Sequence, residues 1–376
     1  MELRDLGRRS GLRVPPANMG GMRLPRDTQD AIDLIRYAID AGMRYIDTSR
    51  GYGESEWIFG KALRDGYRER VILSTKSSPW IIKLRPDDQP DATTVRRRIE
   101  ESLRRLDVEC LDYYQVWNIE SREHYEQATR PNGMVDGILK AIEDGLVRRT
   151  GFTTHDSVEN LQDYIREADW CDIILFTYNL LNREYAPAIE AAAKQGIGTL
   201  IMNPVGGGRL AQDSPVLLDL ARKVGAADVP ELAIRYILSN PAVTTVISGI
   251  SKPADVDRTV AAAEKPCFDA EQMREIEAFL SARTPESGGF CTGCEYCLPC
   301  PQGVDIPAVM KCIYNARAWG LHRQARREYG KIEAGKRAEA CTACRLCEAK
   351  CTQNLPIAEE MKWAAAHLAE AENQPR

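Results

Sequence analysis

The chain has 376 residues, of which 44% are hydrophobic and 28% charged, and its formal net charge is −5. This length suits one large domain plus a small one, and the acidic balance argues against binding to nucleic acid or anionic membranes. No apolar run is long enough for a transmembrane helix, and the charged start, MELRDLGRRSGLRV, lacks the apolar segment of a secretory signal. We therefore expect a cytoplasmic protein.

The first 280 residues open with an expected hairpin at 2–14 that plugs the bottom of a barrel, and they then alternate between short apolar runs and amphipathic patterns. The predicted strands are 17–21, 44–49, 71–76, 111–117, 148–154, 172–178, 197–202 and 243–248. The predicted helices are 28–41, 54–63, 93–106, 136–143, 158–168, 184–195, 215–223 and 270–280. Eight such units favour a (β/α)8 TIM barrel over a doubly wound sheet, since no G-x-G-x-x-G follows an early strand.

Eight of the 12 cysteines lie in two runs, CTGCEYCLPCP at 291–301 and CTACRLCEAKC at 341–351. Bunched cysteines in a cytoplasmic protein indicate metal binding rather than disulfides. Each run contains C-x-x-C-x-x-C, which suits three irons of a cubane cluster. Structural zinc sites usually have two separated C-x-x-C pairs instead, so zinc is disfavoured.

In bacterial two-cluster ferredoxins the fourth cysteine of each run ligates the other cluster. This pattern predicts one [4Fe-4S] cluster on Cys291, Cys294, Cys297 and Cys351, and another on Cys341, Cys344, Cys347 and Cys300. The gap before Cys300 is two residues, whereas the pattern and the second run have three. Cys312 lies on the next helix and could replace Cys300 as a ligand, but we expect a packing role for it. The predicted domains are a barrel at 1–282, a linker at 283–290 and a small, mainly helical ferredoxin-like domain at 291–376.

Seven segments, in order and spacing, resemble blocks of the aldo/keto reductase family. They are GGMRLP, IDTSRGYGESE, LSTKS, LDYYQV, YNLLNRE, NPVGGGRL and VISGISKPADV. The whole chain is similar to a subgroup of that family with a C-terminal module for two [4Fe-4S] clusters. The resemblance implies an oxidoreductase that acts on a carbonyl or alcohol group of a small molecule, with NAD(H) or NADP(H) as a further cofactor.

The resemblance also implies catalytic roles. Tyr52 would be the acid/base, Lys76 would tune it, and Asp47 would hold the lysine. The family's fourth catalytic residue is a histidine, but its position, five residues after Asp112, holds Trp117. Tryptophan has one N–H donor and no titratable group, so Trp117 can bond a carbonyl oxygen weakly or form an apolar wall.

The cofactor contacts depart from the family as well. The carboxamide positions correspond to Thr153, Thr154 and Leu175, and leucine offers no hydrogen bond. Asp255 stands where a basic residue commonly holds the 2′-phosphate of NADP, so we expect NADH to be favoured over NADPH. The remaining predicted cofactor-binding residues are Gly21, Met22, Met202, Gly206, Gly207, Gly208, Arg209, Ser251, Lys252 and Arg258. The glycine triplet with its arginine suits a pyrophosphate.

Four functions compete. The favoured one is an iron–sulfur oxidoreductase in which Tyr52 moves a proton and the clusters pass electrons, fed by an external redox partner. The alternatives are a plain nicotinamide-dependent reductase with structural clusters, a non-redox isomerase or lyase, and an electron-transfer partner protein on a degenerate barrel. The intact Asp47, Tyr52 and Lys76 argue against a mere scaffold, and the altered nicotinamide contacts argue against the plain reductase.

Overall fold

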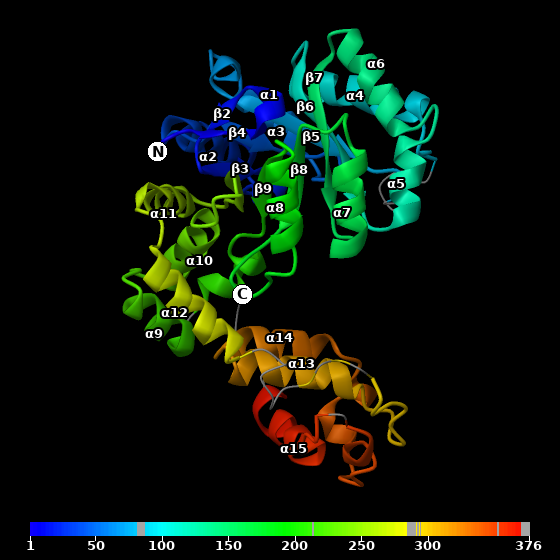
Figure 1. Cartoon of the computed structure of the whole chain (residues 1–376), viewed down its shortest axis with the longest axis vertical. Coiled ribbons are helices and arrows are strands. Elements are labelled where there is room, and N and C mark those ends of the chain that lie inside the picture. The colour runs from blue at the N-terminus through cyan, green and yellow to red at the C-terminus, as the bar shows by residue number, and fades with distance from the viewer. Residues whose placement is uncertain are drawn as a thin grey trace. The chain divides into compact units, whose positions relative to one another are not determined.

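The computed structural model describes residues 1–80, 87–212, 214–283, 291, 293, 295–351 and 353–369. Eight parallel strands close into a barrel in the order β10-β3-β4-β5-β6-β7-β8-β9 (Figure 1). These strands are β3 (Ala17–Gly20), β4 (Tyr45–Asp47), β5 (Ile72–Ser77), β6 (Leu111–Ile119), β7 (Val147–Thr154), β8 (Ile173–Thr177), β9 (Gly198–Met202) and β10 (Thr245–Gly249). The predicted TIM barrel is therefore confirmed, and each strand overlaps its predicted segment.

Helices follow the strands and cover the outside of the barrel (Figure 1). They are α2 (Thr28–Asp40), α3 (Ser55–Ala62), α4 (Ala92–Leu106), α5 (Arg122–Thr129), α6 (Met134–Glu143), α7 (Val158–Glu167), α8 (Ala186–Lys194), α10 (Val229–Leu238) and α11 (Pro253–Glu264). In α2, Asp27 caps the first turn, and a stripe including Ala31, Leu34, Ile35 and Ala38 is buried. The sequence did not predict α5, α10 or α11. In α5 only Tyr125 and Ala128 are buried, which leaves little apolar periodicity to read.

The N-terminal hairpin closes one end of the barrel. Strands β1 (Arg4–Asp5) and β2 (Arg13–Val14) pair antiparallel, with the short helix α1 (Gly7–Ser10) between them. Leu6 and Val14 are fully buried in a cluster with Leu200 and other strand residues. The amide of Arg9 donates to the carbonyl of Gly196, just before β9, so the hairpin lies at the N-terminal ends of the strands. Active sites of such barrels lie at the opposite end, where the strands have their C-terminal ends.

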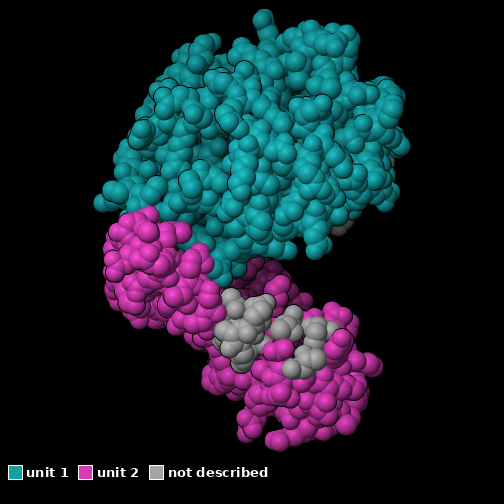
Figure 2. Space-filling view, viewed as in Figure 1, with its two compact units in different colours: residues 1–207, 233–267 teal, residues 208–232, 268–376 magenta. Residues whose placement is uncertain are grey.

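The chain divides into two compact units, one of residues 1–207 and 233–267 and one of residues 208–232 and 268–376 (Figure 2). The second unit contains α9 (Pro215–Lys223), α12 (Ala270–Ser281), α13 (Ile306–Arg317), α14 (His322–Lys331) and α15 (Ile357–Leu368). The Tyr314 hydroxyl donates to the carbonyl of Arg283 at 2.7 Å, which ties α13 to the end of α12. The predicted boundary at 283–290 lies almost wholly outside the described residues and stays a prediction. No described helix has the length and apolarity needed to span a membrane.

Candidate active site and cysteine module

A buried ion pair lies at the C-terminal end of the barrel. Asp47 ends β4 and Lys76 lies on the adjacent β5, and the two side chains are 5% and 1% exposed. Lys76 Nζ donates to Asp47 Oδ2 and, at 2.9 Å, to the carbonyl of Thr48. Gln115 Nε2, from β6, donates to Asp47 Oδ1 at 3.1 Å and to Ser74 Oγ at 2.7 Å. The pair is therefore fixed from three neighbouring strands.

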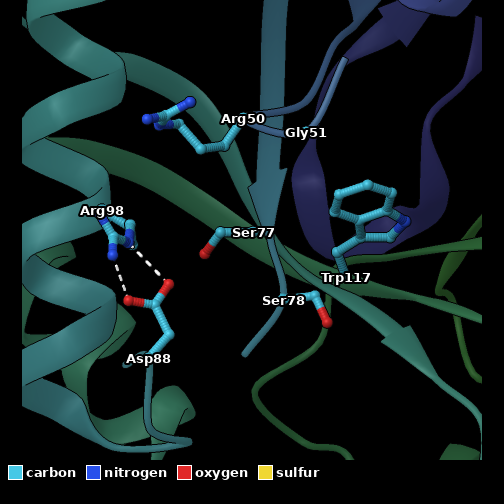
Figure 3. A pocket seen from close by; sticks show the side chains of 7 residues that line it. All are labelled: Arg50, Gly51, Ser77, Ser78, Asp88, Arg98 and Trp117. Atoms are coloured by element: carbon cyan, nitrogen blue, oxygen red, sulfur yellow. Dashed lines mark hydrogen bonds and ion pairs between the residues drawn. The ribbon is translucent and has the colours of Figure 1, made fainter. Parts of the chain in front are cut away.

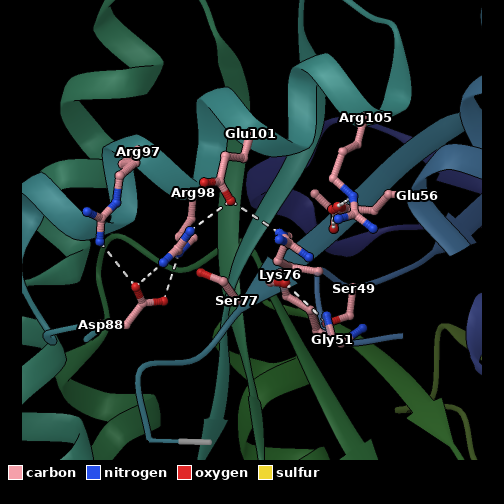
Figure 4. A network of polar contacts seen from close by, with 12 residues as sticks. Ser49, Gly51, Glu56, Lys76, Ser77, Asp88, Arg97, Arg98, Glu101 and Arg105 are labelled. Carbon is pink, nitrogen blue, oxygen red and sulfur yellow. Dashed lines mark hydrogen bonds and ion pairs between the residues drawn. The ribbon is translucent and has the colours of Figure 1, made fainter. Parts of the chain in front are cut away.

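The loop after β4 places Tyr52 next to this pair. Lys76 Nζ lies 5.0 Å from the centroid of the Tyr52 ring. The carbonyl of Lys76 accepts from the amide of Arg50 at 3.2 Å and from the hydroxyl of Ser49 at 3.3 Å. The Ser49 hydroxyl in turn accepts from the amide of Gly51 (Figure 4). The loop that carries the tyrosine is thus fastened to the strand that carries the lysine.

The electrostatics favour a charged lysine and a protonated tyrosine. Burial by itself lowers the pKa of Lys76, but the carboxylate of Asp47 and the hydroxyl of Tyr52 outweigh this effect and raise the pKa above its usual value. Burial raises the pKa of Tyr52, and the opposing effect of the Lys76 charge is smaller. The Tyr52 hydroxyl therefore keeps its proton at neutral pH, as a proton donor requires.

Trp117 reaches the site through an irregularity in β6. The register between β6 and β7 shifts between Val116 and Ile119, and Asn118 has a positive φ of 71°. Such bulges re-aim side chains and are frequent beside active sites. The Trp117 ring meets the Tyr52 ring edge-on, with centroids 5.5 Å apart. The structure thus brings all four predicted catalytic residues together.

A small pocket opens beside these residues. It has a volume of about 140 Å³ and is lined by Arg50, Gly51, Ser77, Ser78, Asp88, Arg98 and Trp117 (Figure 3). Arg98, on α4, donates to Asp88 through Nε at 2.8 Å and to Glu101 through Nη1 at 2.8 Å. Glu101 also accepts from Arg50 Nε at 3.2 Å (Figure 4). The sequence reasoning missed this network, although Arg50 directly precedes the Gly-Tyr pair of the predicted loop.

Gln115 was missed as well. Two-residue alternation along β6 places it on the same face as Tyr113, which faces the barrel interior. A glutamine on that face, beside a strand-terminal aspartate, was a readable signal of a buried hydrogen-bond partner.

The predicted nicotinamide residues are largely engaged with the protein itself. Thr154 Oγ1 donates to the carbonyl of Ile119 at 3.0 Å, and Thr153 Oγ1 accepts from the amide of Asn118 at 2.9 Å. Leu175 belongs to the interior apolar cluster. Met202 ends β9 and is half-buried. These predicted residues therefore offer few free polar groups to the carboxamide of a nicotinamide.

The glycine triplet adopts a conformation that glycine alone adopts readily. Gly206, Gly207 and Gly208 have φ values of 59°, 67° and 97°. The amide of Gly206 is not free, since it donates to the carbonyl of Asn203 at 2.8 Å. Gly206 and Gly207 belong to the first compact unit, whereas Gly208 and Arg209 belong to the second. A role for Arg209 beside the barrel stays a prediction.

Arg23, which the sequence reasoning did not select, lies at the same edge of the barrel. A Cβ added at Gly249 would stand 3.0 Å from Arg23 Cδ, and one at Gly207 would stand 4.0 Å from Arg23 Nη2. No described residue accepts a hydrogen bond from the Arg23 side chain. The lack of side chains at these two glycines gives this exposed cation room beside the backbone. Of the two predicted residues just before it, Gly21 is buried and Met22 is 69% exposed.

The start of α11 holds the remaining predicted cofactor residues. Asp255 Oδ2 accepts from the amide and the hydroxyl of Ser251, at 3.1 and 2.9 Å. Lys252 is the N-cap residue, and both Lys252 and Arg258 are exposed. The carboxylate of Asp255 is therefore held at the helix start by these two hydrogen bonds.

The two cysteine runs wrap their backbone in the same way. The second and fourth residues after the first cysteine of each run have positive φ, at 75° and 65° for Gly293 and Glu295 and at 55° and 60° for Ala343 and Arg345. In both runs the amide two residues on lies 3.4 Å from the first cysteine sulfur. A repeated turn that aims N–H groups at sulfur suits thiolates that ligate a cluster.

A cavity of about 250 Å³ separates parts of the two runs. Its lining includes Cys297, Cys300, Cys341, Cys344 and Cys347. Cys291 and Cys351 pack against the core of this unit, and Cys294 lies outside the described residues. In the described part, no three His, Cys, Asp or Glu side chains converge on one metal ion. Cysteines around a mainly apolar cavity fit a multi-iron cluster, and both Cys297 and Cys300 of the first run line this cavity with the second triplet.

A model of the aldo/keto reductase family matches residues 17–281, more than half of the chain. The chain belongs to this family. A model of the 4Fe-4S dicluster domain matches residues 290–356. This aldo/keto reductase is therefore an oxidoreductase whose barrel is followed by a domain for two [4Fe-4S] clusters.

The regions that match this aldo/keto reductase span most of the length of its curated relatives. A 6-dehydroglucose reductase of Novosphingobium aromaticivorans is 28% identical over 275 residues, which cover 67% of this chain and 87% of the relative. An L-galactose dehydrogenase of Arabidopsis thaliana is 27% identical over 312 residues, which cover 74% of this chain and 94% of the relative. The holo structure of an aldo-keto reductase from Bacillus halodurans has a TM-score of 0.64 at 23% identity, covering 74% and 96%. That likeness supports the barrel fold.

Proposed function

We propose that this oxidoreductase interconverts a carbonyl and an alcohol on a small molecule, with Tyr52 as the acid/base. The observation that carries the proposal is the position of Tyr52 over a buried Lys76–Asp47 pair. In the reductive direction the Tyr52 hydroxyl gives its proton to the carbonyl oxygen. The phenolate that remains lies beside the Lys76 ammonium, which stabilises it until a proton returns.

The reduction adds two electrons and one proton to the carbonyl carbon and one proton, through Tyr52, to the oxygen. A bound nicotinamide would supply the first three together as a hydride, whereas the [4Fe-4S] clusters would supply the two electrons one at a time, with the proton for carbon coming from water. Arg23 and Gly207 would hold a pyrophosphate, whereas among the three predicted carboxamide residues only Thr153 keeps a hydroxyl hydrogen that no described residue accepts. Poor carboxamide contacts beside a complete proton donor favour the iron–sulfur version over a plain nicotinamide-dependent reductase.

The names of the curated relatives support a small carbonyl or alcohol substrate. One is a 6-dehydroglucose reductase and the other an L-galactose dehydrogenase. With the dicluster domain present, we infer that an external redox partner exchanges electrons with the clusters.

The test is Tyr52→Phe in anaerobically prepared protein. The variant should lose at least about 100-fold in turnover of small aldehydes, the lower end for loss of a general acid, whether NADH, NADPH or a reduced viologen drives the reaction. Its iron and sulfide content should match wild type. Tyr37→Phe is the control, because Tyr37 is an exposed tyrosine that bonds Asp257 on the outer surface. Unchanged turnover in Tyr52→Phe would remove the residue from the mechanism.

A further inference from the structure

The pocket beside Tyr52 is lined by the guanidinium group of Arg50, which has few hydrogen-bond partners among the described residues. Arg50 makes one side-chain hydrogen bond to the described residues, from Nε to Glu101. Its two Nη nitrogens have no hydrogen-bond partner in that part of the chain. The side chain is only 17% exposed, and it lines the pocket (Figure 3). A guanidinium in such a position presents two donor nitrogens to whatever occupies the space.

The acidic groups around the pocket are already neutralised. The Asp88 carboxylate accepts from Arg98 on both oxygens and from Arg97 at 3.2 Å. Glu101 Oε2 accepts from both Arg98 and Arg50. Of the charged residues that line the pocket, two carry a guanidinium group, Arg50 and Arg98, and one carries a carboxylate, Asp88. Because Arg98 fixes Glu101 and Glu101 holds Arg50 by Nε, the network orients the free end of Arg50.

Two hydroxyl groups add neutral donors. Ser77 Oγ accepts a hydrogen bond from the Tyr114 hydroxyl at 2.7 Å, and Ser78 Oγ accepts one from the amide of Trp80 at 3.2 Å. Both serines therefore retain a hydroxyl hydrogen, for which the described residues provide no acceptor. Both line the pocket and are only 6% exposed. A cation with two hydroxyl donors is a set that recognises an oxyanion.

The pocket adjoins the proposed reaction site. Gly51, which lines it, is the residue before Tyr52, and Trp117, which also lines it, contacts the Tyr52 ring. Its volume of about 140 Å³ is several times the roughly 10–15 Å³ that one water molecule needs. A short acid with a carbonyl at its other end fits this scale.

We propose that this pocket binds the carboxylate of the substrate, so that the preferred substrates are short oxo acids and hydroxy acids, with Arg50 as the anchoring cation. The inference rests on the proposed function, since it places the anionic end of the molecule whose carbonyl meets Tyr52. It adds a substrate class that neither the fold nor the family determines.

Binding without chemistry is the first test, so that a failure of the proposed function does not affect it. Wild-type protein is titrated with propionate and with propionamide, with tryptophan fluorescence and calorimetry as readouts. Propionate should bind about 10- to 100-fold more tightly, the scale of a charge-assisted hydrogen bond. Arg50→Gln should remove the difference, and Arg50→Lys should keep part of it. Arg64→Gln is the control, because Arg64 forms an exposed pair with Asp107.

Turnover is the second test. The ratio of kcat/KM for 4-oxobutanoate to that for its methyl ester should fall about 10- to 100-fold in Arg50→Gln. Tyr52→Phe should lower kcat/KM equally for both substrates. This result would separate the anchoring role of Arg50 from the proton-donating role of Tyr52. Equal binding of propionate and propionamide by wild type would overturn the inference. Tighter binding of inorganic phosphate than of propionate would also overturn it, in favour of phosphorylated substrates.

Discussion

The indole ring of Trp117 stands edge-on to the phenol ring of Tyr52, with centroids 5.5 Å apart and planes at 80°. This residue occupies the position where the family has a catalytic histidine, and it cannot take up a proton. The contact instead restricts the orientation of the Tyr52 ring. We therefore propose that Trp117 acts on the reaction through the placement of Tyr52 and through the wall of the pocket.

We predict that Trp117→Phe keeps turnover within about threefold of wild type, whereas Trp117→Ala loses up to about tenfold. An edge-on aromatic pair contributes about 0.5–1.5 kcal/mol, and a phenyl ring retains most of it. Steady-state kcat for an aldehyde is the measurement. If Trp117→Phe is as slow as Trp117→Ala, the indole N–H rather than the ring is what matters.

The buried pair below Tyr52 should be essential for stability. Lys76→Met leaves the Asp47 carboxylate buried with Gln115 as its remaining side-chain donor, so we expect a loss of about 3–5 kcal/mol in the free energy of unfolding. The double variant Asp47→Asn, Lys76→Met should recover much of that loss, because no unpaired charge remains. Anaerobic urea unfolding, followed by near-ultraviolet circular dichroism of the aromatic residues, measures both.

The control for this prediction is the exposed pair of Arg64 and Asp107. Arg64→Met should cost no more than about 1 kcal/mol. A Lys76→Met variant that is no less stable than Arg64→Met would show that the pair is not structurally important.

The sequence predicted the barrel well because its signal is local. Each strand is a short apolar run, and residues that end strands, such as Asp47 and Lys76, fall at one end of a parallel barrel. Short helices with few buried residues, such as α5, lack that signal. The domain for two [4Fe-4S] clusters was also predictable in outline, since the cysteine spacing repeats, whereas the exchange of the fourth ligands stays a prediction.

The polar pocket was not predictable, since its members are joined only by folding. Arg50 comes from the loop after β4, Asp88 from the segment after β5, and Arg98 and Glu101 from α4. Each taken alone is a charged residue of the kind that usually faces solvent. The bulge that aims Trp117 was equally hidden, because nothing in LDYYQVWNI marks where the register breaks.

The two directions of the reaction should depend differently on pH. Because burial raises the pKa of Tyr52 above its usual value, the hydroxyl stays protonated through the neutral range. Carbonyl reduction, which needs the proton, should be level from about pH 6 to 9 and fall only at higher pH, since an unperturbed tyrosine titrates near 10. Alcohol oxidation needs the phenolate and should rise with pH, up to tenfold per unit. Profiles of kcat/KM in both directions measure this, and a reduction rate that falls between pH 7 and 8 would contradict it.

The charge of Asp255 should set the choice of nicotinamide. We predict that wild type binds NADH more tightly than NADPH, and that Asp255→Asn narrows the difference by about fivefold, the effect of roughly 1 kcal/mol for a partly exposed charge. Asp257→Asn is a matched control, since Asp257 lies on the same helix and bonds Tyr37 instead. Fluorescence titration of both cofactors is the measurement. Tighter binding of NADPH by wild type would be the contrary result.

Cys300 provides the sharpest test of the cluster ligands, because its run has the shorter gap. It lines the same cavity as Cys341, Cys344 and Cys347, whereas Cys312 is a buried residue of α13 whose thiol pKa burial raises to about 11. We predict that Cys300→Ser loses about four of the roughly eight irons expected for two clusters, while Cys312→Ser keeps them all. Iron and sulfide analysis with electron paramagnetic resonance of the reduced protein measures this. Should Cys300→Ser retain both clusters and Cys312→Ser lose one, Cys312 is the ligand, and the short gap excludes Cys300 from the cluster.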